Sequence, residues 1–166
     1  MKVKNRNLPI LGWREWVAFP AFNVPLLECK VDTGARTSAL HTFYVEDFHE
    51  EGRHKVRFGL HPDRKGTKTE VHCVADVFDQ RFVTDSGGHK EERFVIRTEV
   101  VMGQDIWPIE LTLTNRDNMR FRMLLGRTAM VDNFLVDPSA YHVQGKPSPN
   151  PIECPPFQRQ LADEEE

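Results

Sequence analysis

Short apolar runs separated by turn-forming residues dominate the chain. Seven such runs, rich in β-branched or aromatic side chains as strands typically are, lie at residues 16–19, 26–31, 55–58, 71–78, 94–101, 106–114 and 119–125. Turns of hairpin length follow at 86–88, 102–105 and 115–118, so the last three strands are expected to form a meander. Helical periodicity is confined to about residues 128–134, where Ala129, Met130 and Phe134 give a short apolar face. The pattern predicts a mostly β protein with one short helix.

The carboxyl-terminal part has a different composition from the rest of the chain. Residues 146–156 contain five prolines, and the chain then ends in the acidic run ADEEE, a composition that cannot build a packed core. The whole chain has 166 residues and is 39% apolar, which is enough for one hydrophobic core. We therefore predict one domain over residues 1–144 and a disordered or loosely docked tail over residues 145–166.

Charge and cysteine content narrow the functional classes. A formal net charge of −3 gives no reason to expect nucleic acid or an anionic membrane as a partner. The amino-terminal sequence MKVKNRNLPI lacks the apolar run of a secretory signal, and no stretch approaches the length of a membrane span. The three cysteines are odd in number and have neither zinc-ribbon nor redox-pair spacing, which fits reduced thiols. We expect a cytoplasmic protein.

Two motifs point to the chemistry of aspartic peptidases. Residues 29–40, CKVDTGARTSAL, place Asp-Thr-Gly-Ala after an apolar run, and residues 123–127, MLLGR, place Gly-Arg after another. Such enzymes hold two carboxylates about 3 Å apart around one water, and the pair shares a proton. Asp32 would supply a carboxylate, Thr33 a hydroxyl that bonds across a two-fold axis, and Gly34 room for close backbone approach. Since the triplet occurs once, the second carboxylate must come from another copy, and the enzyme is predicted to be a homodimer.

A glycine-centred segment between these motifs is the candidate flap over the site. Residues 81–97 have strand-like arms and a polar tip that would exclude water from a bound peptide, although an ordinary exposed hairpin gives the same pattern. The predicted substrate contacts are Ala35, Arg36, Thr84, Asp85, Ser86, Gly87 and Gly88. Arg36 is either a surface or dimer-interface arginine or a clamp for a substrate carboxylate, to which arginine presents a planar fork.

With these motifs the chain resembles the retropepsin-like peptidases. Members of that family are homodimers that carry Asp-Thr-Gly-Ala after a strand and an apolar-Gly-Arg before a short helix. Over about residues 10–140 it is similar to the bacterial and archaeal family named ATP-dependent zinc proteases, in the segments GWREWV (12–17), KVDTGARTSAL (30–40), VTDSGG (83–88), IELTLTNRD (109–117) and MRFRMLLGRTAM (119–130). The resemblance implies a small closed antiparallel barrel of retropepsin (acid protease) type, with Gly126 and Arg127 as structural support. Members are associated with RimK-type ATP-grasp ligases, which add glutamates to protein tails. The implied activity is a peptidase that trims such glutamate-rich tails.

Three features of the residues do not follow the name of this family or the retroviral pattern. The sequence has no His-Glu-x-x-His, its seven histidines lack ligand spacing, and no Gly-x-x-x-x-Gly-Lys-Ser/Thr is present, so neither zinc nor ATP is expected as a cofactor. Arg36 stands where the retroviral motif has an acid that pairs with the Gly-Arg arginine. Arg127 is therefore expected to bind Asp132 or a backbone carbonyl. The alternative function is a non-catalytic binding or assembly partner of a RimK-type ligase.

Overall fold

The computed structural model describes residues 7–63, 66–84, 87–116 and 119–153, and the fold in this part of the chain is mostly β, as predicted. Its strands are β1 (Ile10–Leu11), β2 (Arg14–Phe19), β3 (Val24–Val31), β4 (Ser38–His41), β5 (Tyr44–Glu50), β6 (Arg53–Leu60), β7 (Val71–Asp76), β8 (Asp79–Thr84), β9 (Lys90–Met102), β10 (Asp105–Thr114), β11 (Met123–Leu125), β12 (Leu135–Val136) and β13 (Ile152–Glu153). Two 3-10 helices, η1 (Pro20–Phe22) and η2 (Arg127–Ala129), complete the described elements.

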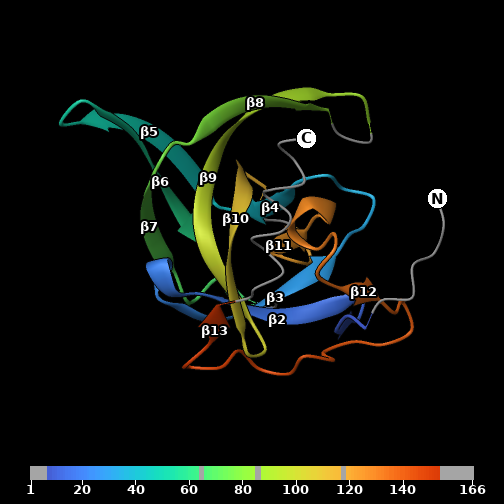
Figure 1. The fold of residues 1–166 in the computed structure, drawn as a ribbon. Helices are drawn as coiled ribbons and strands as arrows, with labels where there is room; N and C mark the ends of the chain where they lie inside the picture. Colours follow the sequence, from blue (N-terminus) through green and yellow to red (C-terminus); the bar gives the residue numbers. More distant parts are fainter. Residues whose placement is uncertain (1–6, 64–65, 85–86, 117–118, 154–166) are drawn as a thin grey trace.

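The largest sheet has the strand order β13-β10-β4-β11-β3-β2-β9-β8, and β9 also pairs with β10. The pairings of six strands therefore return to their starting point through β9 and β10 (Figure 1). Most strand pairings are antiparallel, as expected, but β4 runs parallel to β10 and β11 runs parallel to β3. The predicted meander of the last three strands is wrong, because β4, which the apolar pattern did not indicate, lies between β10 and β11.

A second sheet, β5-β6-β7, shares one hydrophobic core with the large sheet. Phe58 of β6 is fully buried and meets the ring of Phe22, whose centroid is 5.3 Å away. Cys29 and Cys73 are free and buried in this core, and burial raises the pKa of each thiol to about 12. Both are therefore protonated, inert core side chains, as their apolar neighbours in the sequence indicated.

The helix predicted at residues 128–134 is shorter than expected. Only the three-residue η2 forms, and turns follow it. Asp132 has a φ of 65°, in the left-handed region, which ends any right-handed helix at this point. The apolar face is nevertheless used, because Ala129, Met130 and Phe134 are all buried in the core.

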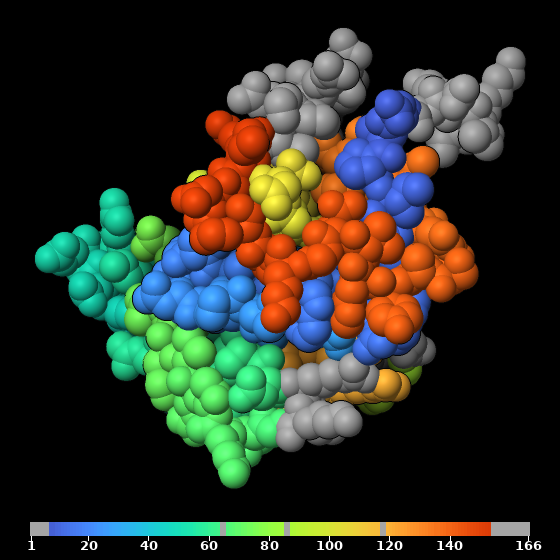
Figure 2. All heavy atoms as spheres, turned by 90° about the horizontal axis from the view of Figure 1, so that it is seen from below, coloured from blue at the N-terminus to red at the C-terminus, as the bar shows by residue number. Residues whose placement is uncertain are grey.

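Beyond β12 the chain runs along β2 and β3, and Figure 2 shows its orange-to-red residues lying across the blue ones. The amide of Trp13 donates to the carbonyl of Ala140 (2.8 Å), and β13 pairs with the start of β10. The buried Glu15 carboxylate accepts bonds from the amides of Val143 (3.0 Å) and Gln144 (3.0 Å). The division at residues 144 and 145 stays a prediction, and residues 154–166 lie outside the described part. No helix in the described ranges is long and apolar enough to cross a membrane.

Candidate active site

The Asp32 loop begins where β3 ends beside β11. Val31 is in register with Leu125, and the Asp32 amide donates to the Leu125 carbonyl (2.9 Å). Oδ1 of Asp32 accepts bonds from the amides of Gly34 (3.0 Å) and Ala35 (3.2 Å), which is the Asx turn that this residue pattern favours. The turn fixes one oxygen of a half-buried carboxylate. Oδ2 makes no hydrogen bond to the described residues and is left to meet a water or another group.

The Gly-Arg motif holds this loop through its backbone. The amide of Gly126 donates to Oγ of Ser38 (2.9 Å), and the amide of Arg127 donates to the Ala35 carbonyl (2.7 Å). The Arg127 side chain donates from Nη1 to the Thr33 carbonyl (3.1 Å), so of the two expected partners it is the backbone carbonyl that binds Arg127. Gly126 is required sterically: a Cβ there would lie 2.5 Å from the carbonyl carbon of Thr37.

The carbonyl of Arg36 is also held, by the amide (3.1 Å) and the hydroxyl (2.9 Å) of Thr128. The Arg36 side chain is exposed and lines a cavity of about 610 Å³. One wall of the cavity is formed by this loop together with Thr128 and Ala129 of η2, and the other lining residues come from β8, β9 and β10. The β8–β9 hairpin, the candidate flap, is paired from Asp79 to Thr84 on its first arm and arches over η2 in Figure 1.

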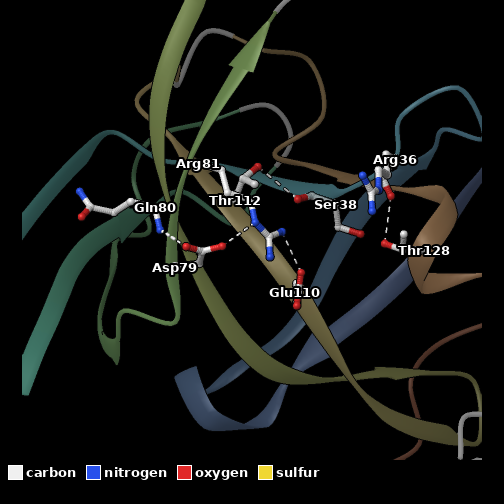
Figure 3. A network of polar contacts seen from close by, with 8 residues as sticks. All are labelled: Arg36, Ser38, Asp79, Gln80, Arg81, Glu110, Thr112 and Thr128. Atoms are coloured by element: carbon white, nitrogen blue, oxygen red, sulfur yellow. Dashed lines mark hydrogen bonds and ion pairs between the residues drawn. The ribbon is translucent and has the colours of Figure 1, made fainter. Parts of the chain in front are cut away.

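A polar network on the flap side of the cavity was not indicated by any motif. Arg81 of β8 donates from Nη1 to Glu110 of β10 (2.9 Å) and from Nε to Asp79 (2.8 Å), as Figure 3 shows. The bond to Glu110, followed by that to Asp79, raises the Arg81 pKa. Arg97 of β9 is in register with Glu110 and also lines the cavity. The only sequence signal was the alternation along the two strands, which places Arg97 and Glu110 on a common face once the register is known.

The structure thus brings most of the predicted site residues into two neighbouring groups. The Asp32 loop and its support contain Asp32, Thr33, Gly34, Ala35, Gly126 and Arg127. Arg36 and Thr84 line the cavity beside it, whereas Gly87 and Gly88 are exposed in the hairpin turn and do not line it. Asp85 and Ser86 lie outside the described residues.

Residues 10–147 match the profile of the RimB-like protein family, which is described as retropepsin-like aspartic endopeptidase RimB. The chain belongs to the RimB-like family. Its curated relatives include proteins named "Probable alpha-L-glutamate ligase" from Desulfotalea psychrophila, 43% identical over 84% of this chain, and from Shewanella pealeana, 47% identical over 80% of it. The matching region is only 30% and 29% of those relatives, so this chain spans less than a third of their length.

A solved structure shows the same fold as this RimB-like chain. A protein of unknown function from Legionella pneumophila superposes with a TM-score of 0.69, at 24% identity, over 84% of this chain and 99% of that one. The Legionella protein therefore has the arrangement of strands described above.

The resemblance of this RimB-like chain to zinc proteases makes its described histidines the first residues to compare with a zinc site. Several histidines are engaged in pairs: His41 bonds Thr114 (2.7 Å), His54 bonds Asp47 (2.9 Å) and His142 bonds Glu28 (2.6 Å). Within the described ranges, no group of three or more His, Cys, Asp or Glu residues is placed to hold a metal ion.

Proposed function

We propose that this chain is one lobe of a homodimeric aspartic peptidase, a closed barrel of retropepsin type in which the Asp32 carboxylates of two copies share one proton. The observation that carries this proposal is the Asp32 loop itself. Its carboxylate is fixed by two amides and its backbone is held by Arg127, beside a cavity under a β-hairpin. The contact between Thr33 and Arg127 joins the two motifs across 94 residues of sequence, which supports reading them as parts of one site.

In this mechanism each Asp32 has a separate task. The ionised carboxylate takes a proton from the water held between the two copies, while the protonated one donates to the scissile carbonyl oxygen. The hydroxide so formed attacks the carbonyl carbon and gives a gem-diol. The C–N bond then breaks as the amine takes a proton from one carboxyl group, while a hydroxyl of the gem-diol gives its proton to the other carboxylate, which restores the shared proton of the dyad. Thr33 and Gly34 are exposed in this single lobe. In the proposed dimer the Thr33 hydroxyl bonds its symmetry mate, and Gly34 allows the two loops to approach. No step of this route uses a metal ion or ATP.

The proposed substrates are glutamate-rich protein tails in the cytoplasm. Arg36 lines the cavity next to the Asp32 loop and offers a planar fork to a carboxylate. The relatives' name supports this substrate class, because proteins named as glutamate ligases contain a region similar to this chain. A peptidase acting on the product of a RimK-type ligase would then work beside that ligase, as part of the same chain or as a separate partner.

The test is hydrolysis of a glutamylated peptide by the wild type and by Asp32→Asn, with Asp63→Asn as the matched control. Asp63 is exposed and lies outside the site, so the control should keep wild-type activity. Asp32→Asn should abolish hydrolysis, keep the wild-type melting temperature, and form the same dimer under assay conditions. A strictly monomeric species with full activity would refute the shared dyad, as would activity that chelators abolish and Asp32→Asn leaves intact.

The second candidate is a non-catalytic binding or assembly partner of a RimK-type ligase. It is favoured by the relatives in which a similar region forms about 30% of a longer protein named as a ligase. Under this alternative the purified chain binds the ligase, and Asp32→Asn binds equally well, while no peptide is cut by either protein. Cleavage that requires Asp32 would decide for the peptidase.

A further inference from the structure

The cavity beside the Asp32 loop has an unequal distribution of charge. Its charged lining residues are Arg36, Arg81, Arg97 and Glu110, and all the others are uncharged. The charge of Arg81 is already compensated, because its guanidinium bonds Glu110 at 2.9 Å and Asp79 at 2.8 Å. Arg36 and Arg97 form no ion pair with any described acidic residue. Two positive charges in the cavity therefore have no acidic partner on its walls.

The position of Arg97 suits the binding of a planar anion. The central carbon of its guanidinium lies 4.6 Å from the centroid of the Phe78 ring, so the ring supports one face of the group. Stacking of this kind limits the rotation of the side chain and leaves the N–H edges available, which is the geometry that carboxylates bind. Although Glu110 is the cross-strand neighbour of Arg97, its carboxylate is bonded to Arg81.

We infer that Arg97 is a specificity-determining residue for acidic peptides and binds a second substrate carboxylate in addition to the one at Arg36. Glu110 limits this preference, because its carboxylate is paired with Arg81. Glu110 thus takes the place that a further substrate carboxylate would have. The identification of the occupant as a peptide substrate rests on the proposed function. The charge argument itself concerns binding alone, so it can be tested separately from catalysis.

The inference predicts opposite effects for two substitutions in the same cavity. Arg97→Gln removes an uncompensated positive charge and should weaken binding of an acidic peptide about tenfold, which corresponds to about 1.4 kcal/mol. Glu110→Gln keeps a hydrogen-bond acceptor for Arg81 but removes the negative charge, and should strengthen binding about threefold or more. Both effects should shrink as salt is raised, because the cavity is open to solvent. A role of Glu110 in packing alone would give weaker binding or no change.

The experiment measures equilibrium binding of a glutamate-rich peptide and of its Glu→Gln counterpart of equal length. All variants carry Asp32→Asn so that the peptide is not cut, and Arg53→Gln is the control for net charge. Arg53 is exposed on the three-stranded sheet, pairs with Asp76 at 3.6 Å and does not line the cavity. The glutamine peptide should respond to neither cavity substitution, and Arg53→Gln should change acidic-peptide binding by less than about twofold.

Each outcome bears on the inference. Equal losses in Arg97→Gln and Arg53→Gln, no binding of the acidic peptide, or weaker binding in Glu110→Gln would overturn it. If acidic peptides bind as expected but the wild type cuts none of them, the peptidase proposal fails and this inference stands. If the wild type cuts acidic peptides and Arg97→Gln binds them equally well, the inference fails and the peptidase proposal stands.

Discussion

Gly126→Ala should both destabilise the protein and displace the Asp32 loop. A Cβ at this position would lie 2.5 Å from the carbonyl carbon of Thr37, 2.7 Å from its oxygen and 2.8 Å from the amide nitrogen of Ser38. All three atoms belong to the backbone, so no side-chain rotation relieves the overlap. The loop must move instead, and the bond of 2.9 Å from the Gly126 amide to Oγ of Ser38 is strained with it.

The size of the effect follows from these contacts. Overpacking a well-filled site costs about 1–3 kcal/mol, and weakening the buried hydrogen bond adds about 1 kcal/mol. A loss of about 3 kcal/mol in the free energy of unfolding corresponds to a melting temperature about 6–12 °C lower for a chain of this size. The rate of peptide hydrolysis should fall even at temperatures where the variant is folded, because the displaced segment carries the carbonyl groups that position the Asp32 loop.

The assay is denaturant unfolding of Gly126→Ala beside Gly66→Ala, followed by hydrolysis at a temperature where both variants are folded. Gly66 is the matched control, since nothing lies within 4 Å of a Cβ built there. Gly66→Ala should unfold at the same denaturant concentration as the wild type. If Gly126→Ala also does so, and cuts peptide at the wild-type rate, then the close approach of Gly126 to the loop is not needed for either property.

Two further predictions concern charged groups. Arg36→Ala should raise KM for glutamate-rich peptides tenfold or more, about 1.4 kcal/mol, leave neutral peptides little changed, and be partly rescued by Arg36→Lys; equal effects on both peptides would make Arg36 a structural residue. Burial, followed by the charges of nearby arginines, lowers the pKa of His41 from 6.5 to about 4, so the unfolded chain binds the proton more readily. Stability should therefore fall, by on the order of 3 kcal/mol, as the pH drops from about 6.5 to 4, and His41→Asn should flatten this dependence; an unchanged slope would exclude His41 as its source.

Local chemistry explains why the Asp32 loop could be predicted from the sequence. An apolar strand followed by Asp-Thr-Gly specifies an Asx turn through contacts within three residues, and the bonds from Gly34 and Ala35 to Asp32 are of this kind. The mostly β content followed in the same way from short β-branched runs bounded by turns. The prediction of a helix over residues 128–134 was wrong because the positive φ of Asp132 depends on how this segment packs. The apolar pattern of these residues carries no information about that packing.

Strand order and the cavity required the tertiary structure. β4 is a short, fully buried strand without alternation, and its insertion between β10 and β11 depends on pairings with residues far along the chain. Likewise, Arg81 and Glu110 are 29 residues apart, and their contact across the cavity follows only from the placement of the β8–β9 hairpin beside β10.

The strand-rich composition, the Asp-Thr-Gly turn and the apolar-Gly-Arg motif could be recognised in the amino-acid sequence, because the interactions that specify them are short in range. The folded arrangement was needed to show that Arg127 binds the Thr33 carbonyl, that Arg97 stacks on Phe78, and that Glu110 pairs with Arg81. These contacts depend on how the packing of the whole core places segments that are far apart in the sequence. For the strand residues Arg81, Arg97 and Glu110, a change of one residue in register would turn the side chain to the opposite face of its sheet.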